Sequence, residues 1–151
     1  MAMLKAITHT QIWVLDQDEA LDFYVGKLGF EVNTDADLEF MRWLTVNLPG
    51  DPDREILLEV PKAAPYMDED TAEQIRDLLS KGAVGVAMIV STDDCRATYE
   101  ELRSKGVEFT EEPVERFYGT DCALRDPFGN HIRITQPAPM PADAPSEKTS
   151  A

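Results

Sequence analysis

The feature that most constrains the fold is a strand–helix–strand pattern that occurs twice in the chain. In the first copy, residues 8–14 are rich in β-branched and aromatic side chains, which favour a strand. An aspartate follows that can cap a helix, and a glycine later can end it. The second copy begins with an apolar strand at residues 85–91. The paired positions, each 77 residues apart, are Asp16 with Asp93 and Gly29 with Gly106. The sequence therefore predicts two modules on one plan.

Each copy continues with three further strands. Alternating or continuous apolar runs bounded by turn residues mark them. They are expected at residues 31–34, 40–47, 55–60, 107–110, 122–125 and 131–136, with a short helix at 71–79 between the copies. The predicted organisation is one domain at 1–136, with module 1 at 5–60, a connector and short helix at 61–83, module 2 at 84–136, and a disordered Pro-rich tail at 137–151.

The first 30 residues carry an ordered set of short motifs. They are His9, Val14-x-Asp16, Ala20-x-x-Phe23-Tyr24 and Leu28-Gly29-Phe30. In this order they resemble the vicinal oxygen chelate superfamily, which holds glyoxalase I, the bleomycin-resistance proteins and the extradiol dioxygenases. The resemblance covers residues 5–136. It implies an α+β fold in which two βαβββ modules form curled mixed sheets around a central cavity.

The same resemblance implies four metal-ligand positions, two in each module. The first falls on His9 and the second on Glu59. The third falls on Val86 or Ala87, depending on how the repeat is aligned, and neither side chain can bind a metal. The fourth falls on Arg133, a permanent cation that would repel a divalent ion. We therefore expect no cofactor. A divalent Ni, Zn, Fe or Mn ion belongs only to the alternative of an atypical metal enzyme.

Glu59 and Arg133 occupy equivalent positions in the last strands of the two modules. One possibility is an ion pair between them across the cavity, which would offset the cost of removing both charges from water. The other is that Arg133 binds a ligand carboxylate or phosphate. Gln11 or His131 offers a substitute metal ligand under the alternative reading.

Aromatic residues supply the rest of a pocket. Gln11 and Trp13 share a strand face with His9, and His131 shares one with Arg133. Aromatic walls suit planar or apolar ligands. The predicted ligand-binding residues are His9, Gln11, Trp13, Trp43, Glu59, Phe117, Tyr118, His131 and Arg133.

The composition indicates which kinds of partner and which cellular compartment to expect. A net charge of −15 disfavours nucleic acid and anionic membranes. No run of about 18 apolar residues is present, so no membrane span is expected. The N-terminus lacks the apolar core of a secretory signal, and Cys95 and Cys122 are too few for a disulfide scaffold. We expect a cytoplasmic protein that forms a homodimer, because the module edges would leave strands unpaired.

The function expected from these features is metal-independent binding of a small molecule between the modules. The alternatives are an atypical metal-dependent lyase or dioxygenase, and a metal-free isomerase-like enzyme with Glu59 as its base. Fold alone does not choose between a binder and an enzyme.

Overall fold

The structure, a computed structural model, describes residues 2–62 and 66–139. The predicted tail falls almost entirely outside these ranges. The first module consists of β1 (His9–Trp13), α1 (Gln17–Tyr24), β2 (Glu31–Leu38), β3 (Met41–Asn47) and β4 (Glu55–Glu59). The helix α2 (Glu69–Ser80) follows. The second module consists of β5 (Val86–Ser91), α3 (Cys95–Ser104), β6 (Glu108–Arg116), β7 (Gly119–Arg125) and β8 (His131–Pro137).

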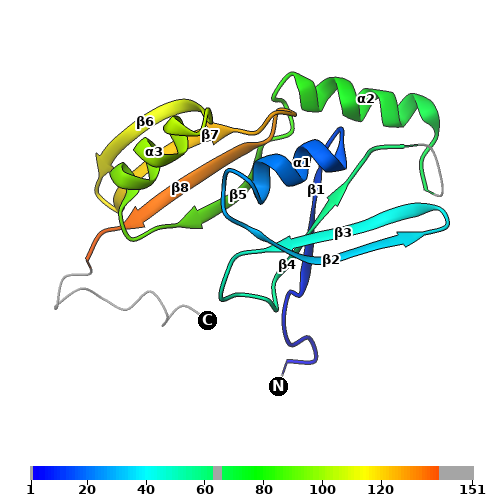
Figure 1. Ribbon diagram of the computed structural model, residues 1–151, viewed down its shortest axis with the longest axis horizontal. Helices are drawn as coiled ribbons and strands as arrows, with labels where there is room; N and C mark the ends of the chain where they lie inside the picture. Colours follow the sequence, from blue (N-terminus) through cyan, green and yellow to red (C-terminus); the bar gives the residue numbers. More distant parts are fainter. Residues whose placement is uncertain (1, 63–65, 140–151) are drawn as a thin grey trace.

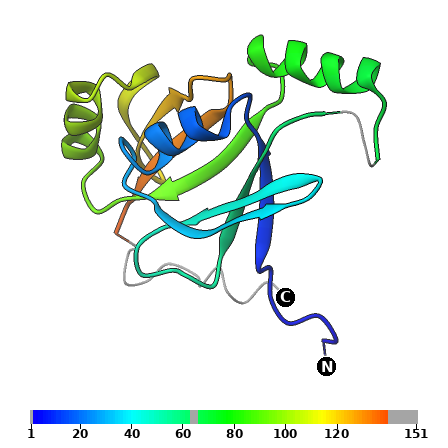
Figure 2. The same cartoon turned by 45° about the vertical axis from the view of Figure 1, so that its right-hand side comes forward.

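The modules form two four-stranded sheets with the same topology. Sheet 1 has the order β1-β4-β3-β2, and sheet 2 has the order β5-β8-β7-β6. In each sheet the first and last strands of the module pair in parallel, and the other neighbours are antiparallel. The sheets lie side by side, with α2 outside both (Figures 1 and 2). The predicted pair of βαβββ modules and the α+β class are therefore confirmed.

One face of each sheet packs against a helix of its own module. Helix α1 contacts β4, and α3 contacts β6, β7 and β8 (Figure 1). Ile12 of β1 and Val14 directly after it are buried in the core, whereas His9 and Gln11 are exposed. Thr10 is exposed as well, so buried and more exposed side chains alternate only from Gln11 to Val14. Among the described residues, no helix has the length and apolar character needed to cross a membrane.

The structure changes several predicted boundaries. Strand β2 runs to Leu38 and β6 to Arg116, well beyond the predicted 34 and 110. Both extensions carry charged residues, and β6 contains Pro113 beside register shifts. Such features hide a strand from a pattern of apolar residues, because proline and bulges interrupt the ladder. Asp94 caps α3, and its carboxylate accepts a hydrogen bond from the Ala97 N–H at 3.0 Å.

A turn in the second module fastens it to the first. The Asp126 carboxylate accepts hydrogen bonds from the N–H groups of Phe128, Gly129 and Asn130 at 2.8–2.9 Å. Its other oxygen accepts from the buried Tyr24 hydroxyl of α1 at 2.7 Å. The Asn130 amide also donates to the carbonyl of Trp13 at 2.8 Å. The turn thus ties α1 and β1 to the entrance of β8.

Candidate functional site

Each sheet has a face opposite its helix, and these two uncovered faces carry most of the predicted site residues. On sheet 1 the face begins with His9, whose Nε2 lies 3.0 Å from Oε2 of Glu55. The other Glu55 oxygen accepts a hydrogen bond from the Thr45 hydroxyl at 2.7 Å. The His9 ring stands 6.1 Å from the Trp43 ring, centroid to centroid. His9 is therefore held between a carboxylate and an aromatic wall.

Sequence reasoning missed Glu55. Glu55 is the first residue of β4. The parallel register of β1 and β4 sets Glu55 opposite His9, and Glu59 opposite Trp13. The sequence alone does not show this contact, because it depends on the parallel pairing of β1 and β4, which places their first residues side by side.

Glu59 lies at the far end of β4, away from His9. Its carboxylate accepts a hydrogen bond from the Tyr66 hydroxyl, which raises the pKa of Tyr66 to about 12. A cavity of about 100 Å³ opens beside Glu59, lined also by Gln17 and Lys62. Glu59 therefore lies in a small hollow together with a proton-bearing neighbour, the Tyr66 hydroxyl.

The residues at the family's metal-ligand positions do not fit a single ion. His9 and Glu59 are four residues apart along paired strands. At about 3.3 Å per residue their backbones are separated by about 13 Å, too far for both side chains to reach one ion at about 2.1 Å. In the described part of the chain, no group of three or more His, Cys, Asp or Glu side chains is arranged to hold a metal.

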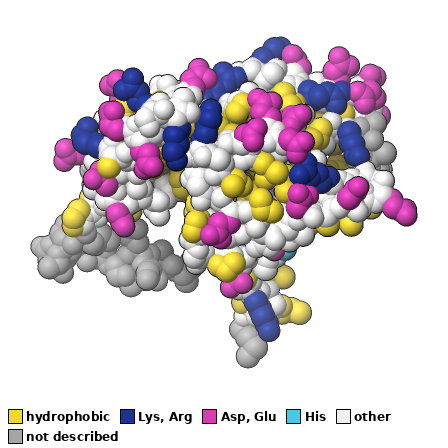
Figure 3. Space-filling view, in the orientation of Figure 1, with side chains coloured by type: hydrophobic (Ala, Val, Ile, Leu, Met, Phe, Trp, Pro, Cys, Tyr) yellow, Lys and Arg dark blue, Asp and Glu magenta, His cyan; other side chains and the backbone are white. Residues whose placement is uncertain are grey.

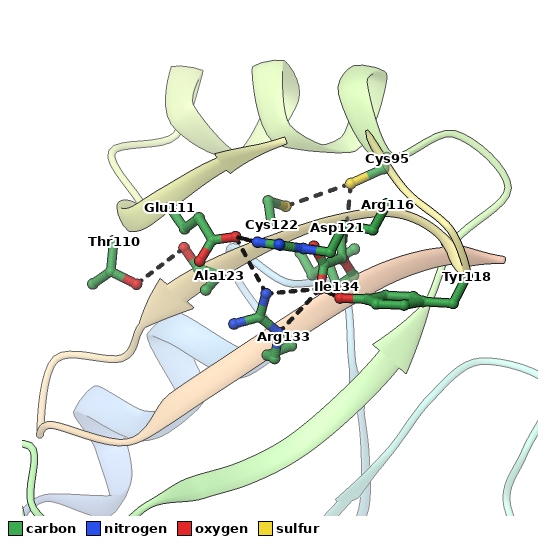
Figure 4. A network of polar contacts seen from close by, with 10 residues as sticks. All are labelled: Cys95, Thr110, Glu111, Arg116, Tyr118, Asp121, Cys122, Ala123, Arg133 and Ile134. Atoms are coloured by element: carbon green, nitrogen blue, oxygen red, sulfur yellow. Dashed lines mark hydrogen bonds and ion pairs between the residues drawn. The ribbon is translucent and has the colours of Figure 1, made fainter. Parts of the chain in front are cut away.

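The uncovered face of sheet 2 carries a cluster of paired charges centred on Asp121, whose side chain is 2% exposed. One carboxylate oxygen accepts from Arg133 at 2.7 Å and from the Tyr118 hydroxyl at 2.8 Å, and the other accepts from Arg116 at 2.9 Å. Both arginines also contact Glu111 (Figure 4). Burial alone would raise the pKa of Asp121, but the hydrogen bonds from Arg133, Arg116 and Tyr118 outweigh it and lower the pKa.

The predicted ion pair between Glu59 and Arg133 is not formed in the structure. Arg133 pairs with Asp121 and Glu111 on its own sheet, and Glu59 pairs with Tyr66. The physical reason is proximity within a sheet: Asp121 lies on the strand that neighbours β8, so a carboxylate is already within reach of Arg133.

The remaining residues of sheet 2 are spread out. The His131 ring nitrogen Nε2 lies 2.9 Å from the carbonyl oxygen of Gly82, so His131 contacts the segment after α2 rather than a shared site with Arg133. Phe117, at the β6–β7 turn, is 97% exposed, and its ring meets the Tyr118 ring edge-on at 5.2 Å. The hairpin thus presents an aromatic pair to its surroundings.

The edges β1 and β5 come together around a hollow of about 260 Å³. Gln11 and Trp13 line it from the first module, and Val86 and Ala87 line it from the second. Val86 is 56% exposed and Ile89 66% exposed, whereas Ala87 packs against the core. A register shift between residues 86 and 88 brings Val86 and Ile89 to the same exposed side.

Comparison with known proteins settles the family. Residues 6–134 match the model of the Glyoxalase/Bleomycin resistance protein/Dioxygenase superfamily. The chain belongs to this superfamily. It is 37% identical over 130 residues to the uncharacterized protein YurT of Bacillus subtilis (strain 168), covering 86% of this chain and 98% of YurT.

Two solved structures are also similar. UcmS2 shares 42% sequence identity at a TM-score of 0.83, covering 89% of this chain and 99% of UcmS2. TnmS3, an antibiotic binding protein from Streptomyces sp. CB03234, shares 27% identity at a TM-score of 0.71, covering 91% of this chain and all of TnmS3. The predicted resemblance and fold are confirmed by these matches.

Proposed function

We propose that this superfamily member binds a small organic molecule on the uncovered faces of its sheets and needs no metal ion to do so. The proposal rests on the observation that the polar side chains on these faces are paired with each other. His9 is paired with Glu55, and Arg133 with Asp121, so these polar groups bind each other instead of surrounding an ion. Two half-buried tryptophans supply the aromatic walls: Trp43 lies beside His9, and Trp13 lines the hollow between β1 and β5.

Aromatic and aliphatic walls favour a ligand with a large apolar or planar part. The similarity to TnmS3, whose description is an antibiotic binding protein, supports the same class of ligand for this chain. We therefore propose an aromatic antibiotic or a related planar compound as the ligand.

A metal-free isomerase-like activity is the second candidate. The arrangement of Glu59 beside the Tyr66 hydroxyl in a cavity of about 100 Å³ favours it, because a base and a hydroxyl in one hollow can share a proton. A substrate for such a reaction would have to reach the far end of β4 rather than the neighbourhood of His9.

Tryptophan fluorescence tests the binding proposal directly, because the chain has only two tryptophans and both lie on the proposed site. Titration with bleomycin and with a panel of planar aromatic antibiotics should give saturable quenching for at least one compound. Trp43→Ala should weaken that binding about tenfold, about 1.4 kcal/mol, by removing one wall. Leu78→Ala, an exposed apolar position on α2, is the matched control and should change nothing. Equal affinity in Trp43→Ala and the unmodified protein would contradict the proposed site.

We also propose a homodimer. Strands β2 and β6 end their sheets, and Ile89 and Phe117 expose apolar side chains beside the proposed site. Sedimentation equilibrium at micromolar concentration should give twice the chain mass of 16.9 kDa. A single species at 16.9 kDa would refute the dimer. The cytoplasmic location and the lack of nucleic-acid and membrane partners stay predictions from composition.

A further inference from the structure

A hollow lined by both modules lies on the helix side of sheet 2, away from the proposed ligand site. It measures about 300 Å³, at the low end of the volumes that hold small ligands. Its wall is mainly apolar and comes from the turn after α1, from β5, from α3 and from the buried side of sheet 2. The principal apolar lining residues are Phe30, Met88, Val90, Leu102, Leu124 and Ile134.

Two lysines stand at the edge of this apolar hollow. Lys27 follows α1 and Lys105 caps the end of α3, and both line the cavity. The Lys105 ammonium lies 3.4 Å from the backbone oxygen of Lys27. The Lys27 ammonium lies against Gly106, where a Cβ would meet it at 3.8 Å. The C-terminal turns of α1 and α3 therefore bring both ammonium groups to one side of the hollow.

These ammonium groups are weakly neutralised. Lys105 has one carboxylate neighbour, Glu101, at 3.8 Å, and both side chains are largely solvated, so this pair is weak. Within the described ranges, no carboxylate lies within 4.0 Å of Lys27. The Thr92 and Thr98 hydroxyls at the rim bond each other at 2.8 Å, whereas Glu101, which also lines the hollow, holds its carboxylate 3.8 Å from the Lys105 ammonium. Lys and Arg side chains gather between α3 and α1 on the face seen in Figure 3, although the chain carries a net charge of −15.

We infer that this cavity binds an amphiphilic anion, a carboxylate with an apolar body of medium length. The carboxylate lies between Lys27 and Lys105, where charge-assisted hydrogen bonds hold it. The apolar body lies against Leu28, Met88 and Val90, which are partly exposed and which the ligand covers from water. The negative partial charges of the two helix ends explain lysines at this place, but not an apolar hollow beneath them. The inference does not rest on the proposed function, which uses the opposite face of the sheets.

Decanoate is the test ligand, and 1-decanol is its uncharged match. By calorimetry, decanoate should bind the full-length protein, and the Lys27→Met/Lys105→Met double variant should bind it at least tenfold more weakly. The affinity for 1-decanol should be the same in both proteins. Tryptophan emission should not respond to decanoate, because neither Trp13 nor Trp43 lines this hollow. A response would place decanoate in the other site and overturn the inference.

Leu48→Phe is a second variant that adds volume at the rim of the hollow, where Leu48 is partly solvated and a fold defect is not expected. It should weaken both decanoate and 1-decanol. Three results overturn the inference: decanoate binding weaker than about 1 mM, equal decanoate binding in the lysine double variant, or unchanged binding in Leu48→Phe. The hollow could instead hold part of a second copy of the chain. In that case the unmodified protein would not bind decanoate, and Leu48→Phe would lose the dimer. That result would also overturn the inference.

Discussion

Asp126→Ala should lower the free energy of unfolding by about 3–5 kcal/mol, the largest effect we expect from a single substitution. The carboxylate satisfies three backbone N–H groups, the Asn130 amide and the Tyr24 hydroxyl, and the residue is almost fully buried. Alanine leaves these donors without a partner in a place that water does not reach. Urea denaturation of the variant and the unmodified protein, followed by circular dichroism, measures the difference.

Tyr24→Phe is the matched control for this junction. It removes one of the donors to Asp126 and keeps the aromatic packing against Phe23 and Phe30, so we expect a loss of only about 1 kcal/mol. If Asp126→Ala cost no more than Tyr24→Phe, the turn would not fasten the modules as described.

The junction also has a signature at high pH. Burial, and after it the charge of Asp126, raises the pKa of Tyr24 well above its ordinary value. The folded state therefore favours the neutral phenol, and this contribution is complete below the unfolded pKa of about 10. It is lost as the pH rises from there toward the folded pKa. Tyr24→Phe should accordingly lose less stability than the unmodified protein between about pH 10 and 11.

Asp121→Asn should cost about 2–3 kcal/mol, the second largest effect. The substitution keeps the shape of the side chain but removes the charge that holds Arg133 and Arg116. Both arginines keep contact with water, which limits the cost. Asp35→Asn is the matched control, because Asp35 makes a forked pair with Arg42 at 2.9 Å on an exposed strand, and its loss should stay below about 1 kcal/mol.

The pH dependence of this second effect follows from the lowered pKa of Asp121. Its stabilising contribution is present above the unfolded pKa of about 3.9 and is lost as the pH falls through the folded pKa. The unmodified protein should therefore lose its advantage over Asp121→Asn below about pH 4. Denaturation midpoints at pH 7 and pH 3 measure this, and an equal gap at both pH values would contradict the role given to the carboxylate.

The fold was predictable from the sequence because its signals are local. Helix caps, glycine stops and apolar periodicity repeat along the chain, and they placed both modules. The turn at residues 126–130 contains Pro127 and Gly129, which mark a turn locally. Its partner Tyr24 lies 102 residues earlier, so the buried bond that gives the turn its role had no local signal.

The site was only partly predictable, because its partners depend on strand register. His9 and Trp13 were assigned to one strand face from alternation. In the structure the His9 ring lies beside Trp43, whereas Trp13 packs against the core. Equivalence between modules suggested Glu59 with Arg133, yet each charge pairs with a nearer residue. Asp121 sits on β7 next to β8, and only the register of that hairpin shows that its carboxylate meets Arg133.

The most direct test of the central claim is ligand titration of protein whose metal content is known. Protein dialysed against EDTA and checked by elemental analysis would be titrated with the best compound of the fluorescence panel, then again after addition of Ni, Zn, Fe or Mn. The account predicts less than about 0.1 ion per chain before addition and a Kd that agrees within about twofold in all samples, a difference under about 0.4 kcal/mol. Binding that appears only with added metal, or about one ion per chain that survives dialysis, would contradict it.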